Sequence, residues 1–134
     1  MNIDDYPLSR HIAPSVVINI AEMTKVNPDY DISLDDINAW EEKHGKIPEG
    51  AAAILYSGRG VNWGDDQDYF DKDKKGEDHY PGFSLEAPTF LVRERHISLL
   101  GTDLPLPYCP ALRRKTKSGR SPWATPIVIS FSAT

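Results

Sequence analysis

The residues best suited to chemistry follow two apolar stretches of the sequence. Trp63 stands a few positions beyond one stretch, and Asp103 follows another. His79 and Tyr80 lie between them, beside a glycine turn. Imidazole and carboxylate groups move protons in catalysis, and aromatic rings line pockets for flat substrates. We therefore take Trp63, His79, Tyr80 and Asp103 as the candidates to line a substrate site.

The same residues have structural interpretations that the sequence leaves open. Aromatic side chains in a long loop often fix that loop to a sheet, which would account for Trp63 and Tyr80 without a ligand. His79 follows an acidic stretch, so it can equally be a hydrogen-bonded loop residue. Cys109 has no histidine near it in the sequence and carries no signal of a nucleophile.

Metal-binding patterns are missing from the sequence. Its histidines are His11, His44, His79 and His96, and they are spaced by 33, 35 and 17 residues. Catalytic metal sites commonly use pairs of histidines only a few residues apart. The single cysteine cannot form an intramolecular disulfide or a cysteine-based zinc site. We predict no metal ligands and no cofactor in this chain.

Composition narrows the class of protein. With 134 residues, 40% hydrophobic and 26% charged, the sequence predicts one folded domain or part of one. The net charge of -5 argues against a nucleic-acid binder. The sequence contains neither a secretory signal nor an apolar run long enough to span a bilayer, so we predict a cytoplasmic protein with no membrane partner.

The elements expected to position the candidates alternate between strand and helix. Strands are expected at residues 16–20, 51–56 and 96–100, and helices at residues 34–43 and 85–95, with a loop over residues 63–78. Ser33 and Ser84 are the expected N-caps. A strand, crossover helix and strand place the two strands parallel, and ligands collect at the carboxyl ends of such strands. Those ends carry residues 57–63 and Asp103.

Five short segments together resemble a known family. They are residues 14–18 (Pro-Ser-Val-Val-Ile), 47–51 (Ile-Pro-Glu-Gly-Ala), 60–65 (Gly-Val-Asn-Trp-Gly-Asp), 79–84 (His-Tyr-Pro-Gly-Phe-Ser) with Ala87, and 99–103 (Leu-Leu-Gly-Thr-Asp). In their order and spacing they resemble the cyclase family of metal-dependent hydrolases, which includes kynurenine formamidases and isatin hydrolases. The resemblance covers about residues 10–105. It implies an α/β fold: an incomplete swivelling β/β/α cyclase-like domain with a mixed, partly parallel sheet.

The resemblance ends near residue 110. Residues 111–120 contain five basic residues and no acid, and they do not match the family. We therefore divide the chain into a partial cyclase-like domain, residues 1–110, and a basic tail, residues 111–134. Residues 127–131 within that tail offer a possible further strand.

The resemblance also implies a chemistry that this chain lacks the ligands to perform. Family members hydrolyse small amides or lactams with zinc or manganese, which is held chiefly by a His-x-Gly-Thr-His-x-Asp-x-Pro motif. No such motif occurs here, and no histidine or glutamate follows His96. We predict a partial, kynurenine-formamidase-like amide hydrolase, converting N-formyl-kynurenine to kynurenine and formate or acting on a related aromatic lactam. As an isolated chain it is predicted to be inactive.

A second hypothesis assigns the chain to another class of protein. An incomplete sheet leaves unpaired edges that can template association. On this alternative the chain is a non-catalytic interaction module that pairs with itself, as a homo-oligomer, or with a full-length relative.

Overall fold

The fold is seen in a computed structural model, which describes residues 5, 12–69 and 71–104. The predicted basic tail, its possible strand at residues 127–131, Cys109 and His11 lie outside the described residues. Within the described part, the α/β class with parallel strand pairing is confirmed. No helix in these ranges has the length and apolar character needed to cross a membrane.

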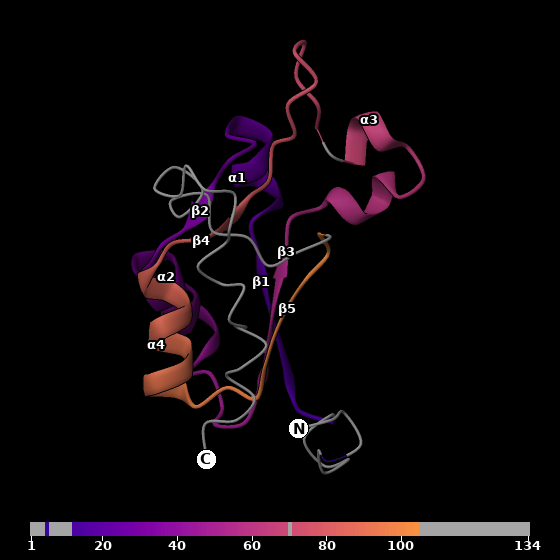
Figure 1. Cartoon of the computed structure of the whole chain (residues 1–134). Coiled ribbons are helices and arrows are strands. Elements are labelled where there is room, and N and C mark those ends of the chain that lie inside the picture. Colours follow the sequence, from indigo (N-terminus) through magenta and orange to yellow (C-terminus); the bar gives the residue numbers. More distant parts are fainter. Residues whose placement is uncertain (1–4, 6–11, 70, 105–134) are drawn as a thin grey trace.

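Two small parallel sheets organise the described residues (Figure 1). The larger sheet has the strand order β1-β3-β5, with β1 at Ser15–Asn19, β3 at Ala52–Tyr56 and β5 at Leu99–Thr102. The smaller sheet pairs β2, Asp31–Ile32, with β4, Gly82–Phe83. The helices are α1 (Ala21–Val26), α2 (Leu34–His44), the 3-10 helix η3 (Arg59–Asn62), α3 (Asp66–Tyr69) and α4 (Glu86–Arg95).

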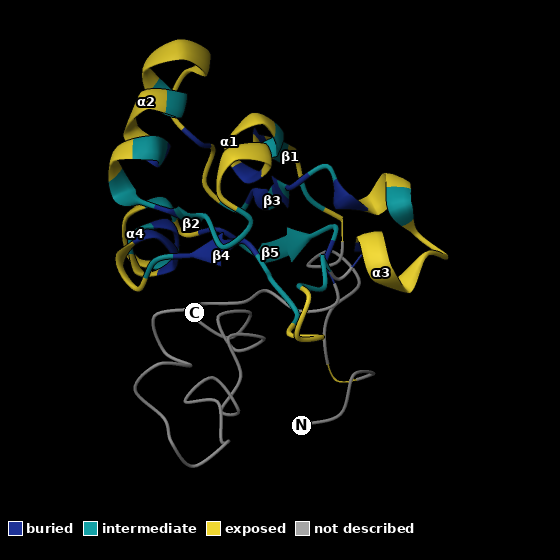
Figure 2. Cartoon of the chain, turned by 90° about the horizontal axis from the view of Figure 1, so that it is seen from above, coloured by how far each residue is buried: buried dark blue, intermediate teal, exposed yellow. Residues whose placement is uncertain are grey.

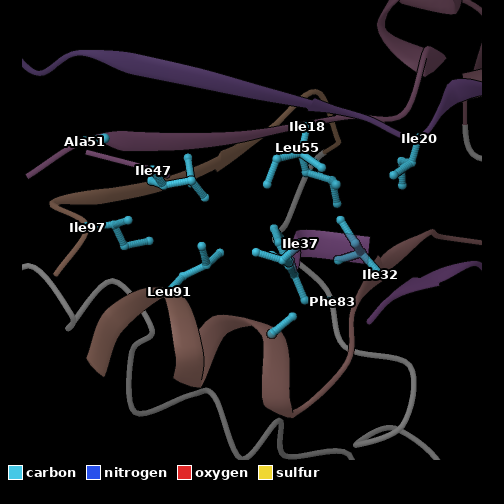
Figure 3. Packing of buried hydrophobic residues seen from close by; sticks show 12 residues of the cluster. Ile18, Ile20, Ile32, Ile37, Ile47, Ala51, Leu55, Phe83, Leu91 and Ile97 are labelled. Atoms are coloured by element: carbon cyan, nitrogen blue, oxygen red, sulfur yellow. The ribbon is translucent and has the colours of Figure 1, made fainter. Parts of the chain in front are cut away.

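The hydrophobic core lies on one face of the larger sheet (Figure 3). Strand side chains alternate between faces, and the register pairs Ile18 with Leu55 on the inner face. Both residues are buried, as are Ile37 of α2 and Leu91 of α4. Burial of these aliphatic side chains provides the main driving force for folding of the described part.

The outer face of the larger sheet carries apolar side chains that are less covered. Val17 is 53% exposed, and its partner in the register, Ile54, is half-buried. Strand β5 is of intermediate burial along its whole length (Figure 2). The Ile54 side chain lies across Gly101, where a Cβ would come within 2.7 Å of Ile54 Cδ1. Helices α2 and α4 lie on the core side of the larger sheet, and on the outer side Figure 1 shows only α3, near the upper end of the strands.

Most of the predicted elements are present, with shifted ends. Helix α2 begins after Ser33 as predicted, and a capping box with Asp36 fixes its first turn. Strand β5 begins later than predicted because His96 adopts a left-handed conformation, with φ of 48°, and ends α4 there. The predicted loop at residues 63–78 contains α3, and the short helix α1 and strands β2 and β4 were not predicted.

Ser84 has a smaller capping role than predicted. Its hydroxyl accepts a hydrogen bond from the Ala87 N–H at 3.2 Å, but the helix itself begins at Glu86, and Leu85, with helical φ and ψ, precedes it. Pro88 in the first turn has no N–H to satisfy, so it is compatible with this start.

Helices α2 and α4 are joined by a largely buried ion pair. Arg95 donates from Nε to Glu41 Oε1 at 2.7 Å and from Nη2 to Glu41 Oε2 at 2.8 Å. Glu41 Oε1 also accepts the Ile47 N–H at 2.9 Å, so one carboxylate connects α2, α4 and the loop that leads to β3. The hydrogen bonds from Arg95 hold the pKa of the Glu41 carboxyl below its ordinary value.

Glu41→Gln is expected to lower the free energy of unfolding by about 2 kcal/mol at neutral pH, because it removes the charge from a bidentate pair. A depressed folded-state pKa gives stability that is present above the ordinary Glu pKa and is lost as the pH falls through the folded pKa. Urea denaturation between pH 7 and pH 3 measures the free energy of unfolding of the wild type and the variant, and their difference is expected to shrink as the pH falls. Since Glu42 is exposed, Glu42→Gln is the control, and an equal loss in both variants would contradict the assignment.

Candidate functional site

The carboxyl ends of β3 and β5 meet around the Asp103 carboxylate. Its Oδ1 accepts hydrogen bonds from the Ser57 N–H at 2.9 Å and the Ser57 hydroxyl at 2.7 Å. Its Oδ2 accepts the Gly60 N–H at 3.2 Å. Asp103 therefore follows the strand end as predicted, and its carboxylate fixes the segment that leaves β3.

Close packing sets the path of that segment. Gly58 has φ of 82°, and a Cβ there would come within 3.1 Å of Ala21 Cβ in α1. Both constraints favour glycine at this position. The carbonyl of Ser57 accepts the Thr24 hydroxyl at 3.0 Å, which fastens α1 to the same turn. The 3-10 helix η3 therefore begins at one defined place beside the carboxyl ends of β3 and β5, which we call the carboxyl edge.

Two aromatic residues stand above this edge. Trp63 packs edge-to-face on Tyr69, with ring centroids 5.3 Å apart, and the Tyr69 hydroxyl donates to the Asp103 carbonyl at 3.2 Å. Trp63 itself is 79% exposed. The structure thus brings Trp63 and Asp103 to one side of the fold through Tyr69, with the indole on the surface. A substrate-lining role for either residue stays a prediction.

His79 and Tyr80 gather around a second carboxylate, that of Asp29. His79 Nδ1 lies 2.8 Å from Asp29 Oδ2, and the Tyr80 N–H donates to Asp29 Oδ1 at 3.2 Å. The Tyr80 hydroxyl donates to Asp78 Oδ2 at 3.0 Å. The hydrogen bond to Asp29 raises the pKa of His79 above its ordinary value. Their role in lining a substrate site is likewise still a prediction.

Arg59 connects the two groups. Its guanidinium donates to the His79 carbonyl at 2.7 Å, to Asp71 Oδ2 at 2.9 Å and to the Pro28 carbonyl at 3.3 Å. The side chain is 8% exposed, and an arginine so deeply buried requires such partners. From η3 it therefore joins the loops that carry Asp29 and His79 to the carboxyl edge.

Sequence reasoning did not single out Arg59, Asp29 or Ser57 as individual residues. One indication for Arg59 was present in the sequence: it stands between two glycines shortly after a predicted strand, where the chain can turn tightly and bury an arginine. Asp29 had no local signal, because its partners are fifty residues away in the chain.

The described residues do not fit a catalytic metal. They contain no group of three or more His, Cys, Asp or Glu side chains that could hold an ion. Both oxygens of the Asp103 carboxylate accept hydrogen bonds from N–H or O–H groups.

Comparisons with known proteins agree on one family. The Cyclase family model, described as "Putative cyclase", matches residues 1–107. Over 104 residues the chain is 29% identical to isatin hydrolase from Roseibium aggregatum, covering 75% of this chain and 39% of that protein.

Solved structures of isatin hydrolases also match about three quarters of the chain. Isatin hydrolase A from Labrenzia aggregata, bound to benzyl benzoate, matches with a TM-score of 0.68 and 33% identity, covering 75% of this chain and 38% of that one. The enzyme from Ralstonia solanacearum matches with a TM-score of 0.67 and 28% identity, covering 78% and 47%. The chain spans less than half the length of these relatives.

Proposed function

Because this chain belongs to the Cyclase family, we propose that it is part of a hydrolase domain for small aromatic amides or lactams and is inactive by itself. The isatin hydrolases that it resembles support the hydrolase class. Isatin is a flat bicyclic lactam, so the resemblance also supports an aromatic cyclic amide as substrate. N-formyl-kynurenine, an open-chain aromatic formamide, is the second substrate that we propose.

The observation that carries the proposal is the organised carboxyl edge. Asp103, Ser57 and Gly60 form a fixed hydrogen-bonded corner where α/β proteins bind ligands, with the Trp63–Tyr69 pair beside it. An exposed indole offers a flat surface for an aromatic ring. The donor set for a zinc or manganese ion is not among the described residues. We therefore propose that this chain provides the framework of the site and part of its substrate-binding surface, and that the described residues do not provide the metal ligands.

The purified 134-residue chain is expected to show no turnover of isatin or N-formyl-kynurenine with zinc or manganese added, because the described residues provide no metal site. Loss of isatin absorbance and release of formate measure the two reactions, and a full-length isatin hydrolase is the positive control for the isatin reaction. Turnover that depends on the added metal and disappears with a chelator would contradict the predicted inactivity.

The outer face of the larger sheet favours a second candidate function. Val17, Ile54 and Leu99 give that face an apolar, uncharged character, which suits a contact with another polypeptide. On this proposal the chain is a non-catalytic interaction module. Sedimentation across a range of concentrations tests it, and a monomer throughout would count against self-association.

A further inference from the structure

His79 lies between carboxylates from two separate segments of the chain. Its Nδ1 is 2.8 Å from Asp29 Oδ2, in the loop between α1 and β2. Its Nε2 is 3.8 Å from Asp73 Oδ2, in the turn that follows α3. These three side chains are about one-third exposed, so solvent protons reach them. A charged imidazolium attracts both carboxylates, with a hydrogen bond to Asp29 and a longer ion-pair contact to Asp73.

The turn at residues 73–77 is built on the other oxygen of Asp73. Asp73 Oδ1 accepts the N–H groups of Lys75 at 2.7 Å and Glu77 at 2.9 Å. The backbone closes the turn through the Asp73 N–H to the Glu77 carbonyl at 2.9 Å. The turn is therefore a preformed unit, and the contact between Asp73 Oδ2 and His79 Nε2 joins it to the Asp29 loop.

Neutral histidine cannot make both contacts. If the remaining proton stays on Nδ1, facing Asp29, then Nε2 presents a lone pair to the Asp73 carboxylate. That contact changes from attractive to repulsive. The Asp29 contact and the Tyr80 N–H bond to Asp29 do not depend on the Nε2 proton, so deprotonation removes the attraction to the 73–77 turn and keeps the contacts of residues 79 and 80.

We propose that His79 is a proton-operated latch, which holds the 73–77 turn against the Asp29 loop when charged and releases it when neutral. Asp71 also faces the imidazole electrostatically, and the hydrogen bond from Asp29 is the main reason that the pKa of His79 is raised. Arg59 donates hydrogen bonds to Asp71 and to the His79 carbonyl. These contacts hold the residues on both sides of the 73–77 turn in place when the turn itself is released.

The direction of the pH effect follows from the raised pKa of His79. A folded-state pKa above the ordinary value gives an attachment that is complete below about pH 6.5 and is lost as the pH rises through the folded value. The turn stands at the same end of the larger sheet as η3 and α3 (Figure 1). Release therefore alters the surroundings of the carboxyl edge at alkaline pH.

Lysines in the turn make the release measurable. Lys74 and Lys75 are exposed, and lysyl endopeptidase cleaves after them, whereas Lys25 in α1 serves as an internal reference for the protease at each pH. In the full chain, cleavage at the turn relative to Lys25 is expected to rise about two- to fivefold between pH 6.5 and pH 9. Mass spectrometry assigns each cut.

Two variants isolate the latch. Asp73→Asn keeps an oxygen to accept the Lys75 and Glu77 N–H groups but places an amide N–H opposite His79 Nε2. Charged histidine repels that N–H and neutral histidine can accept it, so the rise in cleavage between pH 6.5 and pH 9 is expected to be lost. His79→Gln is expected to behave in the same way. If cleavage at the turn relative to Lys25 does not change with pH in the wild type, or changes in Asp73→Asn as it does in the wild type, the proposal is overturned. An NMR titration that places the His79 pKa at or below the ordinary histidine value of about 6.5 would do so as well.

Discussion

Replacing Asp103 with alanine is expected to lower the free energy of unfolding by about 3 kcal/mol, because three donors at the carboxyl edge lose their acceptor together. These donors are the Ser57 N–H, the Ser57 hydroxyl and the Gly60 N–H. Ser57 is buried, so water cannot fully replace the lost bonds. Urea denaturation gives the loss of stability, and amide hydrogen exchange at residues 57 and 60 shows where it acts.

Asp103→Asn is the matched control for this prediction. Its side-chain oxygen still accepts both Ser57 donors, but its amide nitrogen cannot accept the Gly60 N–H. The expected loss is therefore about 1 kcal/mol, with faster exchange at residue 60 and little change at residue 57. Equal losses in the two variants would show that the charge of Asp103, and not the number of bonds that it accepts, holds this corner together.

The position of Asp103 could be predicted from the sequence because the relevant signal is local. An apolar run that ends in glycine, threonine and aspartate predicts a buried strand with a carboxylate at its end, and parallel topology then places that end beside the end of the preceding strand. The start of α2 was predictable for the same reason, since Ser33 and Asp36 form their capping box within four residues.

The surroundings of His79 could not be predicted because they depend on distant contacts. Its partner Asp29 is fifty residues away, and Arg59 reaches it from a different element. Strands β2 and β4 were missed for a related reason: each has two residues, and only their mutual pairing makes them strands. Local propensity contains no information about such pairings.

Ile18→Ala is expected to cost about 3 kcal/mol of stability, because the side chain is 3% exposed and packs in the core between the sheet and the helices. Val17→Ala, one residue earlier on the opposite face, is expected to cost under about 1 kcal/mol, since Val17 is 53% exposed. Urea denaturation of both variants at one protein concentration measures the difference between the two faces.

The comparison of Ile18 and Val17 also bears on the two candidate functions. A loss at Val17 close to that at Ile18 would mean that something covers the outer face in solution. If the loss grows with protein concentration, the cover is a second copy, because association stabilises by mass action. If it does not, the cover is not a second copy. A small loss at every concentration leaves the face open, as an interaction module that pairs with a full-length relative requires.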